Sequence, residues 1–218
     1  MLSALKRYEK KRLNYLYRFA AINKKSSEMP LWQYRYLSEA LLSDAWQGWC
    51  LFSKDLIFNS YRGCFARDGS CVKPLVRPDY KYSRVCYEAK QCGSNPQSKI
   101  KENGHLKFLP HQEPTWGSLD FILNTVYGMG VDNSEYLASV FGSFPHLRMI
   151  QEVRNACAHK NGNIIRKLEN YKTKYSIREV AHPVDYMWGR EKKGRLLAFE
   201  VWLDLMGQAA LLATATAK

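Results

Sequence analysis

Helical periodicity runs through most of this chain and limits what it can fold into. In residues 1–25 the apolar side chains recur at spacings of three and four, with Lys and Arg between them, as in an amphipathic helix. After Pro30, residues 31–61 continue as a second, aromatic-rich helix whose apolar positions cover more than half of its circumference. We therefore expect an all-α protein with residues 31–61 at its centre.

The same periodicity predicts further helices at 118–129, 133–142, 145–159, 164–175 and 195–217, with a connector at 181–194. The last of these helices is long and apolar enough to raise the question of a membrane span. Arg195, Glu200 and Asp204 would be costly in hydrocarbon, so we expect no membrane and a buried or dimer-forming helix instead. Glu200, Asp204 and Gln208 fall at steps of four residues and predict one thin polar stripe.

Residues 62–116 interrupt this pattern. The segment contains four glycines and five prolines and shows no sustained helical period. We expect an irregular, basic, Cys-containing insertion between the second and third main helices, with one short strand pair. The rest of the chain shows no boundary, so residues 1–218 are expected to form a single helical domain.

The charge of the chain favours a polyanionic partner. Lys and Arg number 33 against 20 Asp and Glu, a formal net charge of +13. Such a surplus attracts nucleic acid through long-range attraction and counterion release. An acidic partner protein, or a basic surface that only serves solubility, is the alternative. The N-terminal residues lack the apolar run of a signal peptide, and six cysteines without one are more simply free thiols, so a cytoplasmic location is expected.

The segment "RNACAHKNG", residues 154–162, carries most of the functional information. On a helix, Cys157 shares the core-facing stripe with three apolar residues, whereas Asn155 and His159 point outward one above the other. Arg154 flanks the core stripe, and its long side chain can reach round to the same groove. The core stripe consists of Leu147, Ile150, Val153 and Cys157, and the outward stripe also includes Arg148, Gln151 and Glu152.

Arg154 followed by Asn155, three small residues and His159, with an Asn-Gly helix stop behind, resembles the signature of the HEPN superfamily of small all-helical domains. The resemblance implies an up-and-down helical bundle and a homodimeric, metal-independent endoribonuclease without a cofactor. In that mechanism His159 is the general base or acid for attack of a ribose 2′-OH on the adjacent phosphate, Arg154 stabilises the developing charge, and Asn155 orients substrate or histidine.

The resemblance also suggests a biological setting. Catalytic HEPN proteins are expected in defence or toxin–antitoxin systems, with RNA as substrate and a cognate antitoxin or regulatory protein as a further partner. Toxins of this group that are silenced by nucleotidylation carry a tyrosine two positions after the histidine. Here that position is Asn161, so we do not expect this form of control.

A structural role for the motif is the alternative. Arg154 can pair with Glu152, or with Glu200 or Asp204 of the last helix, and His159 can cap helix carbonyls at the negative end of the dipole. The chain would then be a non-catalytic helical module that binds RNA or a protein.

Other cations are candidates for binding RNA. Arg148 and Lys160 flank the motif, while Arg77, Lys81 and Arg84 alternate with tyrosines that can stack on unpaired bases. A solvated basic loop is an equally good interpretation of the insertion. Its cysteines lack the C-x-x-C pair typical of zinc ribbons, so we assign no metal ligand and leave a structural zinc as the lesser alternative to free thiols. These cysteines are Cys64, Cys71, Cys86 and Cys92.

Overall fold

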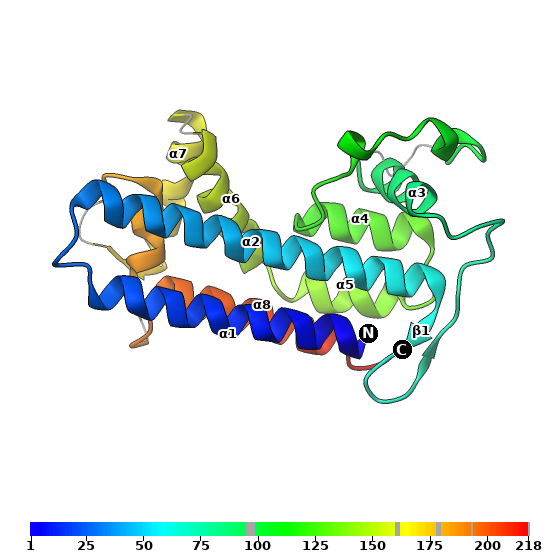
Figure 1. Cartoon of the computed structure of the whole chain (residues 1–218), viewed down its shortest axis with the longest axis horizontal. Coiled ribbons are helices and arrows are strands. Elements are labelled where there is room, and N and C mark those ends of the chain that lie inside the picture. Colours follow the sequence, from blue (N-terminus) through cyan, green and yellow to red (C-terminus); the bar gives the residue numbers. More distant parts are fainter. Residues whose placement is uncertain (95–98, 160–161, 178–179, 193, 218) are drawn as a thin grey trace. The chain divides into compact units, whose positions relative to one another are not determined.

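A computed structural model of the chain describes residues 1–94, 99–159, 162–177, 180–192 and 194–217 (Figure 1). It is mostly helical, with strands of only two residues each, so the expected all-α class is confirmed. The chain forms two compact units. The first contains residues 1–7, 50–145 and 209–218, and the second contains residues 8–49 and 146–208. Helices α1 (Leu2–Lys24), α2 (Leu31–Arg62) and α8 (Ala198–Ala213) contribute residues to both.

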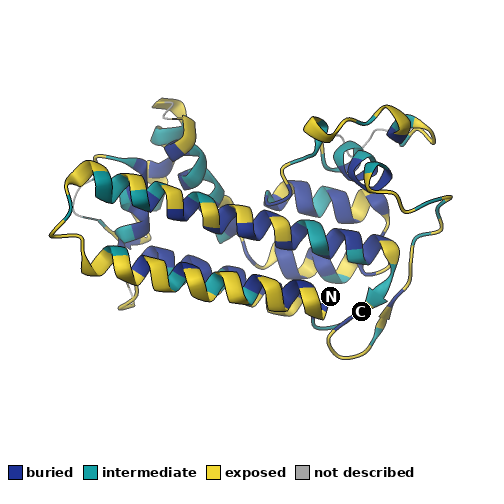
Figure 2. Ribbon diagram, viewed as in Figure 1, coloured by how far each residue is buried: buried dark blue, intermediate teal, exposed yellow. Residues whose placement is uncertain are grey.

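The first unit packs α3 (Tyr82–Ser94), α4 (Leu119–Met129) and α5 (Ser134–Gly142) with the C-terminal part of α2. Apolar residues of α2 from Phe52 to Tyr61 are buried, as Figure 2 shows along this helix. Helices α3 and α4 approach closely at Gly93, where an added Cβ would lie 2.2 Å from the ring of Phe121. Glycine at this position therefore lets the two helices meet.

The insertion is more regular than its composition indicates. The expected strand pair is present as an antiparallel hairpin of β1 (Cys64–Phe65) and β2 (Cys71–Val72). Its turn is tied to the C-terminal segment, because Arg67 and Asp68 donate their backbone N–H groups to the carbonyls of Thr214 and Ala215 at 2.9 and 3.0 Å. The prediction that the segment is otherwise irregular is wrong for α3, and two short 3-10 helices, η1 (Gly104–Lys107) and η2 (Pro110–Gln112), follow it.

A polar cluster fixes the end of the insertion to α2. Glu113 accepts hydrogen bonds from Lys54 Nζ and Trp116 Nε1, each at 2.7 Å, and from the hydroxyl of Tyr82. Burial would raise the pKa of Glu113, but these hydrogen bonds outweigh it and lower that pKa. The insertion is thus held by a charged, satisfied cluster as well as by apolar packing.

The second unit contains the N-terminal part of α2, α6 (His146–His159), α7 (Gly162–Leu168) and most of α8. Most of α1 also belongs to it, together with the 3-10 helices η3 (Glu169–Tyr171) and η4 (Pro183–Trp188), and the antiparallel pair β3 (Tyr175–Ser176) and β4 (Arg190–Glu191). Phe19 of α1 stacks on Trp188 of η4 with ring centroids 4.3 Å apart. Aromatic side chains therefore form much of this core.

Two helices, α7 and α8, are shorter than the sequence predicts. The helix expected over 164–175 ends as α7 at Leu168, because Tyr175 leaves the helical path to become buried in β3, where its hydroxyl accepts a 2.9 Å hydrogen bond from Trp202 Nε1. The last helix begins at Ala198 rather than Arg195, since Leu197 pairs with Arg190 as an isolated bridge and donates its N–H to Glu200.

The polar stripe of α8 is confirmed. Asp204 and Gln208 are exposed and hydrogen-bonded to each other at 2.7 Å, while most apolar residues of the helix are buried within the chain itself. Across the described residues, no helix has the length and apolar character needed to cross a membrane.

Candidate functional site

Helix α6 carries the motif in its last two turns. Pro145 precedes its first residue, and Leu147, Ile150 and Val153 are almost completely buried, as is the neighbouring Cys157, which is 7% exposed. The predicted core stripe is therefore confirmed. Asn155 and His159 lie on the opposite side of the helix, whereas Arg154 flanks the buried stripe.

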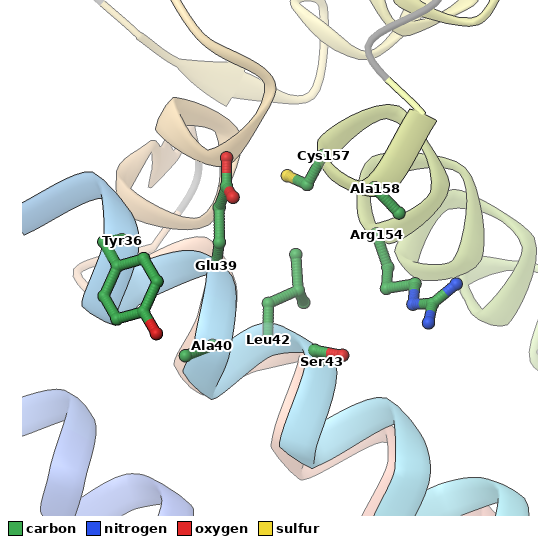
Figure 3. Close-up of a pocket in the computed structure, with 8 residues that line it drawn as sticks. All are labelled: Tyr36, Glu39, Ala40, Leu42, Ser43, Arg154, Cys157 and Ala158. Carbon is green, nitrogen blue, oxygen red and sulfur yellow. The ribbon is translucent and has the colours of Figure 1, made fainter. Parts of the chain in front are cut away.

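Arg154 and Asn155 form a hydrogen-bonded pair. Both are half-buried, and Arg154 Nη1 donates to Asn155 Oδ1 at 3.3 Å. The stem of Arg154 lines a pocket, while its guanidinium points away from the acidic side of that pocket (Figure 3). Asn155 thus orients an arginine whose planar fork of donors suits phosphate oxygens.

His159 is the last residue of α6 and is exposed, as predicted. It stands one helical turn after Asn155 on the same stripe. Arg154 lies about 140° away from His159 around the helix axis, because five residues turn an α-helix through about 500°. Asn155 lies between them, so the three residues form an arc that runs from the edge of the buried stripe to the outward stripe of α6.

The acidic residues that were alternative partners of Arg154 have other contacts. Glu152 accepts a hydrogen bond from the hydroxyl of Tyr171, and burial followed by this bond raises the pKa of Tyr171. Glu200 accepts from the backbone of Leu197, and Asp204 accepts from Gln208. None of these contacts involves the arginine.

A pocket of about 240 Å³ lies between α2 and α6 (Figure 3). Its α6 wall includes Arg154, and its α2 wall includes Tyr36, which is 67% exposed, and Glu39. The sulfur of Cys157 and the carboxylate of Glu39 point toward one another. The full lining consists of Tyr36, Glu39, Ala40, Leu42, Ser43, Arg154, Cys157 and Ala158.

Three potential metal ligands converge beside this pocket. One donor atom each of Glu39, Cys157 and His182 lies within 4.8 Å of the other two. His182 Nε2 is 3.0 Å from Glu39 Oε1, while Nδ1 accepts a 3.3 Å hydrogen bond from the N–H of Val184 at the start of η4. This cluster carries no sequence signal, because its members come from α2, α6 and the residue before Pro183 and share no spacing motif.

The cations proposed for RNA in the insertion have mixed surroundings. Arg84, one of the cations predicted to bind RNA, is only 6% exposed. Its Nε donates to Asp79 at 3.2 Å, Nη1 donates to the carbonyl of Glu102 and lies 3.6 Å from Glu88, and Nη2 faces His105 Nε2 at 3.3 Å. The arginine is part of a buried network because burial of a guanidinium requires several partners.

The remaining cations predicted to bind RNA differ in their exposure to solvent. Arg77 Nε lies 3.2 Å from the buried carboxylate of Glu88, and this ion pair neutralises its charge. Lys81 and Arg148 are exposed. Lys160 lies outside the described residues.

All six cysteines are free thiols. Cys64 and Cys71 lie on the hairpin, whereas Cys86 and Cys92 are buried on α3, where burial above all raises the pKa of each thiol to about 11. Among the described residues these four do not gather with other potential ligands into a metal site.

The site therefore consists of an arc of Arg154, Asn155 and His159 on α6 and an adjoining pocket that Arg154 shares with Tyr36. Only the first part carries a sequence signal, since its residues are contiguous in one helix. Compared with protein-family models, with curated proteins and with solved structures, the chain matches none.

Proposed function

We propose that this chain is a metal-independent endoribonuclease whose active site is formed by Arg154, Asn155 and His159. The observation that carries the proposal is a half-buried arginine fork at the edge of the core stripe of α6, hydrogen-bonded to Asn155, whose outward stripe also carries an exposed histidine. The net charge of +13 supports a polyanionic substrate.

The reaction follows from the chemistry of these groups. His159 takes the proton of a ribose 2′-OH as its oxygen attacks the adjacent phosphorus, and the 5′-oxygen of the next nucleotide leaves with a proton from an acid. Arg154 donates hydrogen bonds to the phosphate oxygens as negative charge develops. The products are a 2′,3′-cyclic phosphate and a 5′-hydroxyl, and the RNA itself supplies the nucleophile.

The arc geometry favours a dimeric site. Since Arg154 and His159 of one chain face directions about 140° apart around α6, a second copy packed on this surface can bring its histidine to the first copy's arginine. Most apolar residues of α8 are buried within the chain, so we place the dimer contact on the exposed half of α6 rather than on α8.

The proposal is tested with a mixed RNA pool, purified full chain, and reactions with and without EDTA. We expect cleavage to persist in EDTA, and mapping of the new ends to show cyclic phosphates and 5′-hydroxyls. Cleavage that requires an added metal ion, or that leaves 5′-phosphates, contradicts the proposal.

A non-catalytic RNA-binding module is the second candidate. Three aromatic side chains, Tyr17, Trp32 and Tyr36, are each more than two thirds exposed, and exposed aromatic rings can stack on unpaired bases. This function predicts RNA binding with unchanged RNA length. Binding that is equal in wild type and His159→Ala, without new RNA ends in either, favours it over the ribonuclease.

A further inference from the structure

We propose that Glu39, Cys157 and His182 bind one Zn²⁺ ion at the wall of the α2–α6 pocket. The three residues come from α2, from α6 and from the residue that precedes η4, and one donor atom of each lies within 4.8 Å of the other two. The proposal does not depend on RNA cleavage, because none of the three belongs to the arc of Arg154, Asn155 and His159.

The donor set selects the metal. A thiolate, an imidazole and a carboxylate are the three ligand types that Zn²⁺ uses in proteins, whereas Mg²⁺ and Ca²⁺ prefer oxygen ligands throughout. Three protein ligands leave a fourth tetrahedral position. Glu39 and Cys157 both line the pocket, so this position faces the pocket and is accessible to water or a small ligand.

The distances need only a small contraction. Zinc–sulfur and zinc–nitrogen bonds of about 2.3 and 2.0 Å at a tetrahedral angle separate the two ligand atoms by about 3.5 Å. His182 Nε2 and Glu39 Oε1 are already 3.0 Å apart. Side-chain rotation is therefore enough, without a shift of either helix.

Binding of Zn²⁺ moves one proton within His182 and releases another from Cys157. In the metal-free chain His182 Nδ1 accepts the N–H of Val184, so the neutral ring carries its proton on Nε2 and donates it to Glu39. When Zn²⁺ takes the Nε2 lone pair, that proton moves to Nδ1, and the 3.3 Å hydrogen bond from Val184 is lost. The thiol of Cys157 releases its proton as it becomes a thiolate ligand. One proton is thus released to solvent for each ion bound.

The surroundings shield the ion partly from water. Cys157 is 7% exposed, and the side chains of His182 and Glu39 are 17% and 26% exposed. The ion would join α2, α6 and the start of η4. Because it binds the folded chain and not the unfolded one, it stabilises the fold, and this stabilisation grows with the logarithm of the free ion concentration once that concentration exceeds the Kd.

The experiment uses the full chain, stripped of metal with a chelator and dialysed. Isothermal titration with Zn²⁺ should give one site per chain, with about one proton released when buffers of different ionisation enthalpy are compared. Co²⁺ should produce a near-ultraviolet thiolate-to-cobalt absorption, and Zn²⁺ should raise the unfolding temperature. No stoichiometric binding by the wild type overturns the proposal.

Three variants locate the ligands. Cys157→Ala, Glu39→Gln and His182→Asn should each weaken Zn²⁺ binding at least about tenfold, and Cys157→Ala should abolish the cobalt–thiolate absorption. His182→Asn removes the ring nitrogen but keeps an acceptor for the N–H of Val184. It therefore serves as the decisive variant if Cys157→Ala does not fold.

The matched control replaces two other cysteines together, Cys64→Ser with Cys71→Ser on the hairpin, and should keep the wild-type affinity. His159→Ala should also keep one zinc site, which separates this test from that of RNA cleavage. Wild-type binding by folded His182→Asn, or loss of binding in the hairpin control, places the metal elsewhere and overturns the proposal.

Discussion

His159 and Cys157 stand two positions apart in α6 but face opposite environments, one exposed and one buried. Substitution of an exposed residue usually changes the free energy of unfolding by no more than about 0.5 kcal/mol. Loss of a general acid or base typically lowers the rate by about 10²- to 10⁴-fold. Substitution of His159 should therefore lower the rate of cleavage and leave the free energy of unfolding nearly unchanged.

We expect His159→Ala to keep its stability and to lose RNA cleavage by that factor, with a similar loss for Arg154→Ala because the phosphate loses its donors. Since both residues act in one transition state, the double variant should be little worse than either single one. Single-turnover cleavage and denaturant unfolding measure the two quantities, and His111→Ala, at an exposed histidine of the insertion, is the control. Wild-type cleavage by folded His159→Ala would exclude this histidine from the reaction.

His146, the first residue of α6, makes the stability of the chain sensitive to acid. Burial, and then the charge of Lys174, lower its pKa below the ordinary value of 6.5, and Glu191 opposes them. Below about pH 6.5 the unfolded chain therefore binds this proton more readily than the folded chain, so acidification destabilises the fold. We expect the wild type to lose more stability between pH 7.5 and 5.5 than His146→Gln does, as measured by urea unfolding. An exposed control, His111→Gln, should behave like the wild type.

At the scale of the elements, α3 is held by charge in its interior. Arg84 and Glu88, one turn apart, are both buried, and the network extends to Asp79, Arg77 and His105. His105 Nδ1 faces the carbonyl of Glu102 at 3.1 Å and so carries the proton of the neutral ring, which leaves Nε2 to accept from Arg84. Every member therefore has a partner of the matching kind.

Arg84→Ala leaves the buried carboxylate of Glu88 with fewer partners and should cost about 3–5 kcal/mol of unfolding free energy. The neighbouring variant Lys81→Ala removes an exposed cation and should change stability by no more than about 0.5 kcal/mol. Urea denaturation of both variants compares the two costs. If Arg84→Ala lowers the free energy of unfolding by no more than Lys81→Ala does, the Arg84 network does not stabilise the fold.

The same network explains why α3 could not be predicted from the sequence. Helices such as α2 and α6 were predictable because their apolar residues follow the helical period. In α3 the period is carried by Val85, Ala89 and Cys92, but two charged residues share the buried face and hide the pattern. Cys157 was predicted to face inward, yet the convergence of Glu39 and His182 on it depends on tertiary packing, which no local pattern encodes.

At the scale of the whole molecule, the proposed dimer has a direct test. If each active site combines Arg154 of one copy with His159 of the other, a dimer of one Arg154→Ala chain and one His159→Ala chain contains one intact site. Random re-pairing makes half of the dimers mixed, so the mixture should recover about a quarter of wild-type cleavage. Light scattering of the wild type should give the mass of two chains. No recovery after verified re-pairing would mean that each site is built from a single chain.

The tie between the β1–β2 hairpin and the C-terminal segment also imposes an order of events during synthesis. The N–H groups of Arg67 and Asp68, and the hydroxyl of Ser70 that accepts from the N–H of Ala217, each find their partner 147 positions later in the chain. At translation rates of about 5–20 residues per second, these groups wait roughly 7–30 s for their partners. For that time the N–H groups of Arg67 and Asp68 bond to water, and the first unit is completed only after residues 214–217 have been made.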